Sequence, residues 1–137
     1  MSQPYRESRS KYRAVRAEFR GETYDSKFEA GVAAQLNIRL RAGEIKAVER
    51  QFKIECIPYD CHGEPVLECK VTHKVDFRVQ ENDGTFTLIE AKGPETADYR
   101  MRRKWLLHFW LPAHPDHEYR VVKDVGRKGR GLRWSSK

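Results

Sequence analysis

One short loop constrains this sequence more than any other feature. Residues 81–85 read Glu-Asn-Asp-Gly-Thr and lie between two predicted strands, 66–80 and 86–92. An Asp-Gly pair between alternating runs is typical of a hairpin loop. If Gln80 pairs with Phe86, the same register places Asp76 directly opposite Glu90. We therefore expect an antiparallel strand pair that brings two carboxylates together.

The end of the second run adds a lysine to this pair. Glu90 and Lys92 are two residues apart, so strand alternation places them on one face. Like charges opposite each other destabilise a sheet, and a raised pKa, the lysine or a metal ion must compensate. Gly93 and Pro94 then end the strand, and the glycine leaves room for a substrate backbone to approach. A patch containing Asp76 and these two residues is expected at the strand ends.

The remaining periodicity predicts helices on either side of these strands. A capping-box pattern opens the first helix and Pro94 fits the first turn of the second. In the second helix, Met101, Trp105 and Phe109 are expected to face inward. This αβββαβ order predicts an α/β fold with a mixed central sheet flanked by helices. The expected elements are a helix from Ser26 to Gly43, strands at 51–58, 66–80 and 86–92, a helix from Pro94 to about Trp110, and a strand at 118–125.

Charge divides the chain into three parts. The net charge is +7, and residues 1–20 carry six bases and two acids, whereas residues 126–137 carry five bases and no acid. We expect a basic N-terminal arm at 1–20, one core domain at 21–125, and a basic Arg/Gly-containing tail at 126–137. Basic arms are a common footprint of nucleic-acid binding, although tails of this kind can also serve solubility alone. No apolar run is long enough to span a membrane and no signal core is present, which predicts an intracellular protein.

The residue types favour a hard cation over zinc. Carboxylate oxygens are the ligands preferred by Mg²⁺ or Mn²⁺. A zinc site built from Cys56, Cys61, Cys69 and His73 is the alternative, but the spacing matches no standard motif. The pattern instead predicts that these cysteines pack in the core, with His73 at its edge. Disulfides are not expected for an odd cysteine count in an intracellular chain.

These residues and their surroundings resemble the PD-(D/E)XK nuclease superfamily. Asp76 followed on the next strand by Glu90-Ala91-Lys92 is similar to the superfamily motif. The segments 26–36, 73–77 and 98–122 resemble its first helix, its aspartate strand, and its basic helix with the closing strand. The spacing is most similar to the phage endonuclease I family of Holliday-junction resolvases, and related small phage nuclease-like proteins and transposon end-cleaving nucleases share the arrangement. The resemblance covers residues 24–122 and implies a restriction-endonuclease-like core.

The resemblance implies a role for each matching residue. Asp76 and Glu90 would be metal ligands, with the backbone carbonyl of Ala91 as a further ligand. Lys92 would position the attacking water or stabilise the transition state. Glu29 would be the first-helix carboxylate, acting as a catalytic residue and metal ligand. As an alternative, Glu29 only caps its helix.

The expected function is a Mg²⁺- or Mn²⁺-dependent DNA endonuclease. Branched DNA is the substrate that the resemblance favours, and paired symmetric cuts would imply a homodimer. If the protein is phage-encoded, it would act in the host cytoplasm. Linear duplex or transposon-end DNA is an alternative substrate, and a catalytically inactive nucleic-acid-binding module with a salt-bridged cluster is the other alternative. The bases expected to contact DNA are Lys27, Arg100, Arg103, Lys104, Arg127, Lys128 and Arg130.

Overall fold

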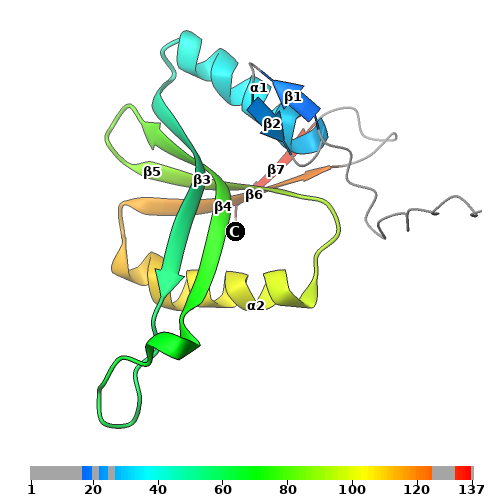
Figure 1. Cartoon of the computed structure of the whole chain (residues 1–137). Coiled ribbons are helices and arrows are strands. Elements are labelled where there is room, and N and C mark those ends of the chain that lie inside the picture. Colours follow the sequence, from blue (N-terminus) through cyan, green and yellow to red (C-terminus); the bar gives the residue numbers. More distant parts are fainter. Residues whose placement is uncertain (1–16, 20–21, 25–26, 125–131, 137) are drawn as a thin grey trace, which may run out of the picture.

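The computed structural model describes residues 17–19, 22–24, 27–124 and 132–136 (Figure 1). Its centre is a five-stranded sheet, and one helix lies on each side of it. A small two-stranded sheet lies beside the first helix. The elements are β1 (Ala17–Phe19), β2 (Glu22–Tyr24), α1 (Lys27–Arg41), β3 (Ile45–Cys56), β4 (Val71–Glu81), β5 (Phe86–Lys92), α2 (Ala97–Trp105), β6 (His117–Asp124) and β7 (Leu132–Ser136).

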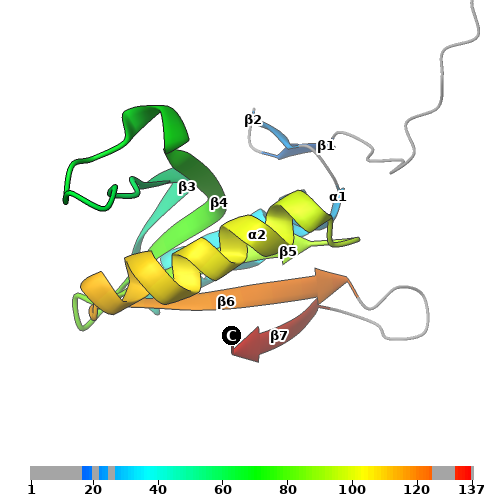
Figure 2. The ribbon, with the colours of Figure 1, turned by 90° about the horizontal axis from the view of Figure 1, so that it is seen from below.

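The sheet is mixed, as predicted. Its strand order is β3-β4-β5-β6-β7, and only the β5–β6 pair is parallel. The parallel pair requires a crossover, and α2 supplies it on one side of the sheet (Figure 2). The α/β class with a mixed sheet and flanking helices is therefore confirmed.

The hairpin loop has the predicted register. β4 ends at Glu81, β5 begins at Phe86, and Gln80 pairs with Phe86. Gly84 has a φ of +89°, which only glycine adopts without strain, and its N–H donates to the Glu81 carbonyl at 3.0 Å. The Asp-Gly signal thus fixes which side chains face each other farther along the two strands.

Two apolar clusters form the core, one on each side of the sheet. The first packs against α1 and the second against the segment that follows α2 (Figure 1). The first contains Val32, Ala33, Leu36, Ile45, Phe77, Val79, Ile89 and Val122, and the second contains Ile54, Val75, Leu88, Leu106, Tyr119 and Val121.

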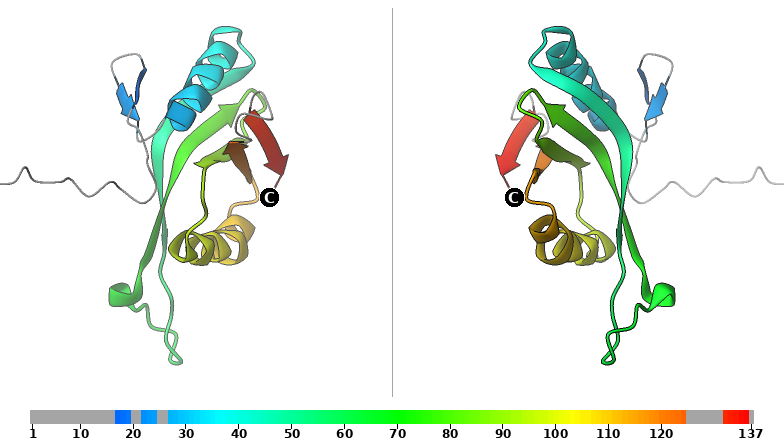
Figure 3. Two further views of the ribbon diagram at one scale, coloured as in Figure 1. Left: turned by 90° about the vertical axis from the view of Figure 1, so that its right-hand side faces the viewer. Right: turned by 90° about the vertical axis from the view of Figure 1, so that its left-hand side faces the viewer.

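Two strands begin elsewhere than predicted. β3 starts at Ile45, six residues before the expected start, because residues 47–50 pair with β4 without being buried between two layers. β4 starts at Val71, five residues later than expected, because a 3-10 turn at Leu67–Cys69 interrupts the chain. The residues between the two strands form a loop that extends away from the rest of the described chain (Figure 3).

The inward face of the second helix was predicted wrongly. Met101 and Phe109 are 47% and 62% exposed, whereas Tyr99 and Leu106 are buried. α2 ends at Trp105 and continues as a π-helical turn over residues 106–110, then as a 3-10 turn over 111–113. Met101 precedes the π turn and is exposed because the buried face of α2 is the one that carries Tyr99. The wider π turn then shifts the angular position of the side chains within and after it, including Phe109, so a regular four-residue spacing does not mark the buried face.

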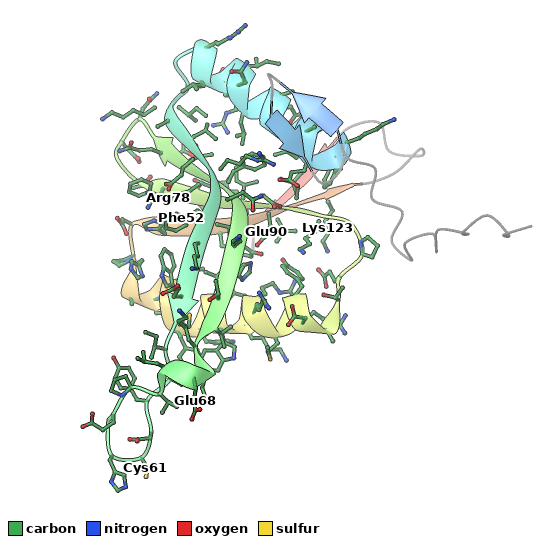
Figure 4. All side chains as sticks on the ribbon, viewed as in Figure 1. Phe52, Cys61, Glu68, Arg78, Glu90 and Lys123 are labelled. Atoms are coloured by element: carbon green, nitrogen blue, oxygen red, sulfur yellow. The ribbon has the colours of Figure 1, made fainter. Side chains whose placement is uncertain are left out.

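The cysteine prediction holds only for Cys56. Its side chain packs partly against the second cluster, but Cys61 and Cys69 are exposed. Figure 4 shows Cys61 in the extended loop, away from the core.

Parts of the predicted arm and tail lie outside the described residues. The described part of the tail, Leu132–Ser136, forms β7 at the edge of the sheet and pairs with β6. Within the described part of the chain, no helix is both long and apolar enough to cross a membrane.

Candidate functional site

The predicted carboxylate pair lies where β4 and β5 separate. The ladder between these strands ends at Phe77 and Ile89, one step before Asp76 and Glu90. Beyond that step the Ala91 N–H donates to Asp76 Oδ2 at 2.7 Å. A side-chain carboxylate thus replaces a strand carbonyl as the acceptor, and the two strands diverge from this point.

The neighbouring strand β3 is distorted at the same level. Gln51 has a φ of 58°, an uncommon value for a residue with a side chain. The register continued from Arg50–Phe77 and Phe52–Val75 would place Gln51 opposite Asp76, but no ladder pair is formed there. Residues held in such conformations occur frequently at functional sites.

Three carboxyl groups influence one another at this point. The pKa of Asp76 is raised to about 8, first by burial and then by the negative charges of Glu90 and Glu29. The Ala91 N–H and the Lys92 ammonium act in the opposite direction. A carboxyl group with this pKa is mostly protonated at pH 7 unless a cation lies beside it.

Glu29 enters the site from α1. Its side chain is only 5% exposed, and Gln51 Nε2 donates to Glu29 Oε1 at 3.4 Å. The predicted capping partner, Ser26, lies outside the described residues. The charge of Glu29 reaches Asp76, so the first helix contributes to the electrostatics of the site.

Glu90 and Lys92 each have a partner on the α2 side. Glu90 is 3% exposed, and its Oε1 forms a hydrogen bond with Nε2 of the buried His73. The Lys92 ammonium lies 3.9 Å from the centre of the Tyr99 ring, and the Tyr99 hydroxyl is 2.7 Å from the Tyr119 hydroxyl. Burial raises the pKa of Tyr99, which keeps its ring neutral beneath the lysine.

A pocket of about 430 Å³ opens between the diverging strands and α2. Arg102 Nη1 donates to the Thr72 carbonyl at 2.7 Å, which ties α2 to β4 at a level where β4 has no partner in β5. In Figure 4, Glu90 lies at the middle of the molecule, between the level of α1 and that of α2. The pocket is lined by Thr72, His73, Lys74, Glu90, Lys92, Thr96, Asp98, Tyr99 and Arg102.

The residues predicted to contact DNA have different surroundings. Lys27, Arg100 and Lys104 are exposed. Arg103 is half-buried and forms an ion pair with Glu95 at 3.2 Å, so part of its charge is already compensated. Arg127, Lys128 and Arg130 lie outside the described residues.

The donor set fits a small hard cation held by two carboxylates. Mg²⁺ is often bound by one or two protein carboxylates together with water and substrate phosphate oxygens, and Asp76 and Glu90 can provide these ligands. A cation there would also relieve the repulsion that raises the pKa of Asp76. Among the side chains that the structure describes, no group of three or more His, Cys, Asp or Glu is arranged to hold an ion.

Sequence reasoning missed two residues of the site. His73 was expected at the core edge and instead contacts Glu90. The Tyr99 ring lies against the Lys92 ammonium. A signal was present for Tyr99, because it is seven residues before the buried Leu106 and shares its helical face. No sequence signal links His73 to Glu90, since the two strands diverge between them.

Comparison with known families identifies a family for most of the chain. The model described as "Protein of unknown function (DUF1064)" matches residues 9–123. A search of curated proteins found no match.

Proposed function

Because the chain belongs to the DUF1064 family, whose description gives no activity, we propose a function from the site itself: divalent-metal-dependent hydrolysis of DNA phosphodiester bonds. The observation that carries this proposal is the half-buried Asp76 carboxyl, whose pKa is raised to about 8 by desolvation and by two neighbouring carboxyls where β4 and β5 diverge. Folding alone does not require this unfavourable arrangement. A site that binds a cation and a phosphate does require carboxyl groups placed close together in this way.

The chain's own residues supply the remaining parts of such a site. Asp76 and Glu90 would hold the ion, and His73 fixes the orientation of Glu90. The Lys92 ammonium can donate a hydrogen bond to a phosphate oxygen or orient a water, because the Tyr99 ring holds it at the pocket. A bound Mg²⁺ would supply Lewis-acid stabilisation of the phosphate and a more acidic water. The reaction adds water across one P–O ester bond and leaves a phosphate monoester and a hydroxyl.

The resemblance to PD-(D/E)XK nucleases supports the same proposal. The motif residues Asp76, Glu90 and Lys92 all belong to the region where β4 and β5 separate. A restriction-endonuclease-like core, branched DNA as the substrate and a homodimer are the finer parts of this proposal, and they rest on the resemblance.

A second candidate is a nucleic-acid-binding module without catalysis. The hydrogen bond between His73 and Glu90 favours it, because this bond already occupies one carboxylate oxygen. Under this alternative the carboxyl groups form a structural cluster and bind no ion.

A cleavage assay separates the two candidates. A labelled four-way junction, a linear duplex and a single strand are incubated with Mg²⁺ or with EDTA. Glu90→Gln and Lys92→Met remove charge with little change in size, and Glu64→Gln, on the exposed extended loop, is the matched control. We expect Mg²⁺-dependent cleavage by the wild type and the control and none by the two site variants.

The outcome on each DNA defines the substrate. Paired cuts on the junction alone would support branched DNA as the substrate. Cleavage of the linear duplex would support the hydrolytic activity but contradict the assignment of branched DNA. If the wild type cleaved none of the three DNAs, the proposal would be contradicted and the non-catalytic binding module would be the remaining candidate.

A further inference from the structure

A pair of lysines lies on β3 and β4 beside the proposed site. Lys53 and Lys74 are directly opposite each other in the antiparallel ladder, and both are exposed. Side chains in such a pair point to the same face of the sheet, with β-carbons about 5 Å apart. Like charges directly opposite each other repel, so this pairing by itself is unfavourable for the fold.

A third lysine, Lys70, lies nearby and shares the Glu55 carboxylate with Lys53. Lys53 Nζ and Lys70 Nζ lie 3.1 and 3.4 Å from the same oxygen of Glu55. These ammonium groups lower the pKa of Glu55, which is therefore ionised at neutral pH. Lys74 forms no ion pair with any side chain that the structure describes. Three positive charges, two on the strands and one just before β4, thus lie near one negative charge.

The lysine pair is close to the proposed reacting centre. It lies two residues along the strands from Gln51 and Asp76, about 7 Å at the usual rise of a strand. Lys74 also lines the pocket that contains Glu90 and Lys92.

We propose that Lys53 and Lys74 form a binding site for backbone phosphates of the DNA, next to the phosphate that enters the pocket. The inference rests on the proposed function, because it identifies how a DNA substrate would be held beside that site. Phosphate between the two ammonium groups converts their mutual repulsion into attraction, and water-exposed lysines can make such contacts without reading the sequence. The alternative is that the two lysines are only solvated surface charges.

The salt dependence of binding tests the assignment. Each phosphate contact contributes about 0.9 to the slope of log K against log salt concentration on duplex DNA, so losing two contacts lowers the slope by about 1.8. The test variant is Lys53→Gln/Lys74→Gln. The charge-matched control is Arg41→Gln/Lys46→Gln, at the exposed junction between α1 and β3. Fluorescence anisotropy with a fluorescein-labelled duplex is measured between 50 and 200 mM salt in EDTA, which keeps the measurement independent of hydrolysis.

The expected result is a slope smaller by about 1.8 for the test variant and a smaller change for the control. Equal slopes for wild type and test variant, or equal losses in both variants, would overturn the assignment. Thermal unfolding provides a second reading. The test variant loses both the repulsion between the two lysines and the exposed ion pair of Lys53 with Glu55, two small effects of opposite sign, so the predicted Tm is nearly unchanged. A clearly lower Tm would mean that the lysines serve the fold and would overturn the assignment. Absence of cleavage with normal binding would contradict the proposed function and leave the phosphate site intact.

Discussion

Replacing Asp76 by asparagine is predicted to stabilise the protein while removing its activity. The amide has almost the same size, and its carbonyl can still accept the Ala91 N–H that Asp76 accepts at 2.7 Å. It cannot carry the negative charge that burial, Glu90 and Glu29 oppose. The substitution therefore removes an unfavourable charge without creating a cavity.

The magnitude follows from the pKa of Asp76. Its rise from 3.8 to about 8 spans about 4 pH units, and at about 1.4 kcal/mol per unit the ionised carboxylate is disfavoured by at most about 6 kcal/mol. Neighbouring carboxyls can take up the proton instead, so we expect a single substitution to recover about 2–3 kcal/mol. Because the folded-state pKa lies above the unfolded value, the wild type loses stability as the pH rises from about 4 to about 8. The advantage of the variant therefore grows over this range and is complete above pH 8.

Urea denaturation in EDTA at pH 5 and pH 8.5 measures this effect. Asp98→Asn is the matched control, because Asp98 is exposed and its ion pair with Arg102 at 3.0 Å is worth about 0.5 kcal/mol or less. The control should show no gain at either pH. If Asp76→Asn were no more stable than the wild type at pH 8.5, the proposed electrostatic strain at the site would be refuted.

Three further predictions concern the same site. His73→Ala removes the partner that orients Glu90, and steady-state cleavage at saturating Mg²⁺ should fall by about 10- to 100-fold, whereas an unchanged rate would show that His73 serves only the core. Mg²⁺ at about 100 times its Kd should raise the unfolding free energy of the wild type by about 2.7 kcal/mol in urea titrations, and Glu90→Gln should lose this response. Tyr99→Phe removes the hydrogen bond to the buried Tyr119 hydroxyl and should lower the unfolding free energy by about 1–3 kcal/mol in the same titrations. Cleavage should persist, because the ring beside the Lys92 ammonium remains. Loss of cleavage by a fully folded variant would assign the hydroxyl to the chemistry.

Local signals in the sequence predicted the hairpin well. The Asp-Gly loop fixed the pairing of Gln80 with Phe86, and the same register placed Glu90 near Asp76. These features depend on neighbouring residues and on a period of two. They can therefore be read without knowledge of the rest of the fold.

The parts that sequence could not predict depend on contacts between distant segments. His73 reaches Glu90 only because β4 and β5 diverge after Phe77, and periodicity gives no sign of that divergence. The π turn after Trp105 changed which face of the helix is buried, and so Phe109 was placed inward although it is exposed. Tertiary packing decides both features.

Direct binding of Mn²⁺ tests the central claim, that the carboxyl groups where β4 and β5 separate form a cation site. Electron paramagnetic resonance counts the bound ions in wild type, Asp76→Asn and Glu90→Gln, with Glu64→Gln as the control. The account predicts one site in the wild type and the control, and its loss in both site variants. Equal binding by all four proteins, or none by the wild type, would contradict it and leave Asp76 and Glu90 as a structural cluster.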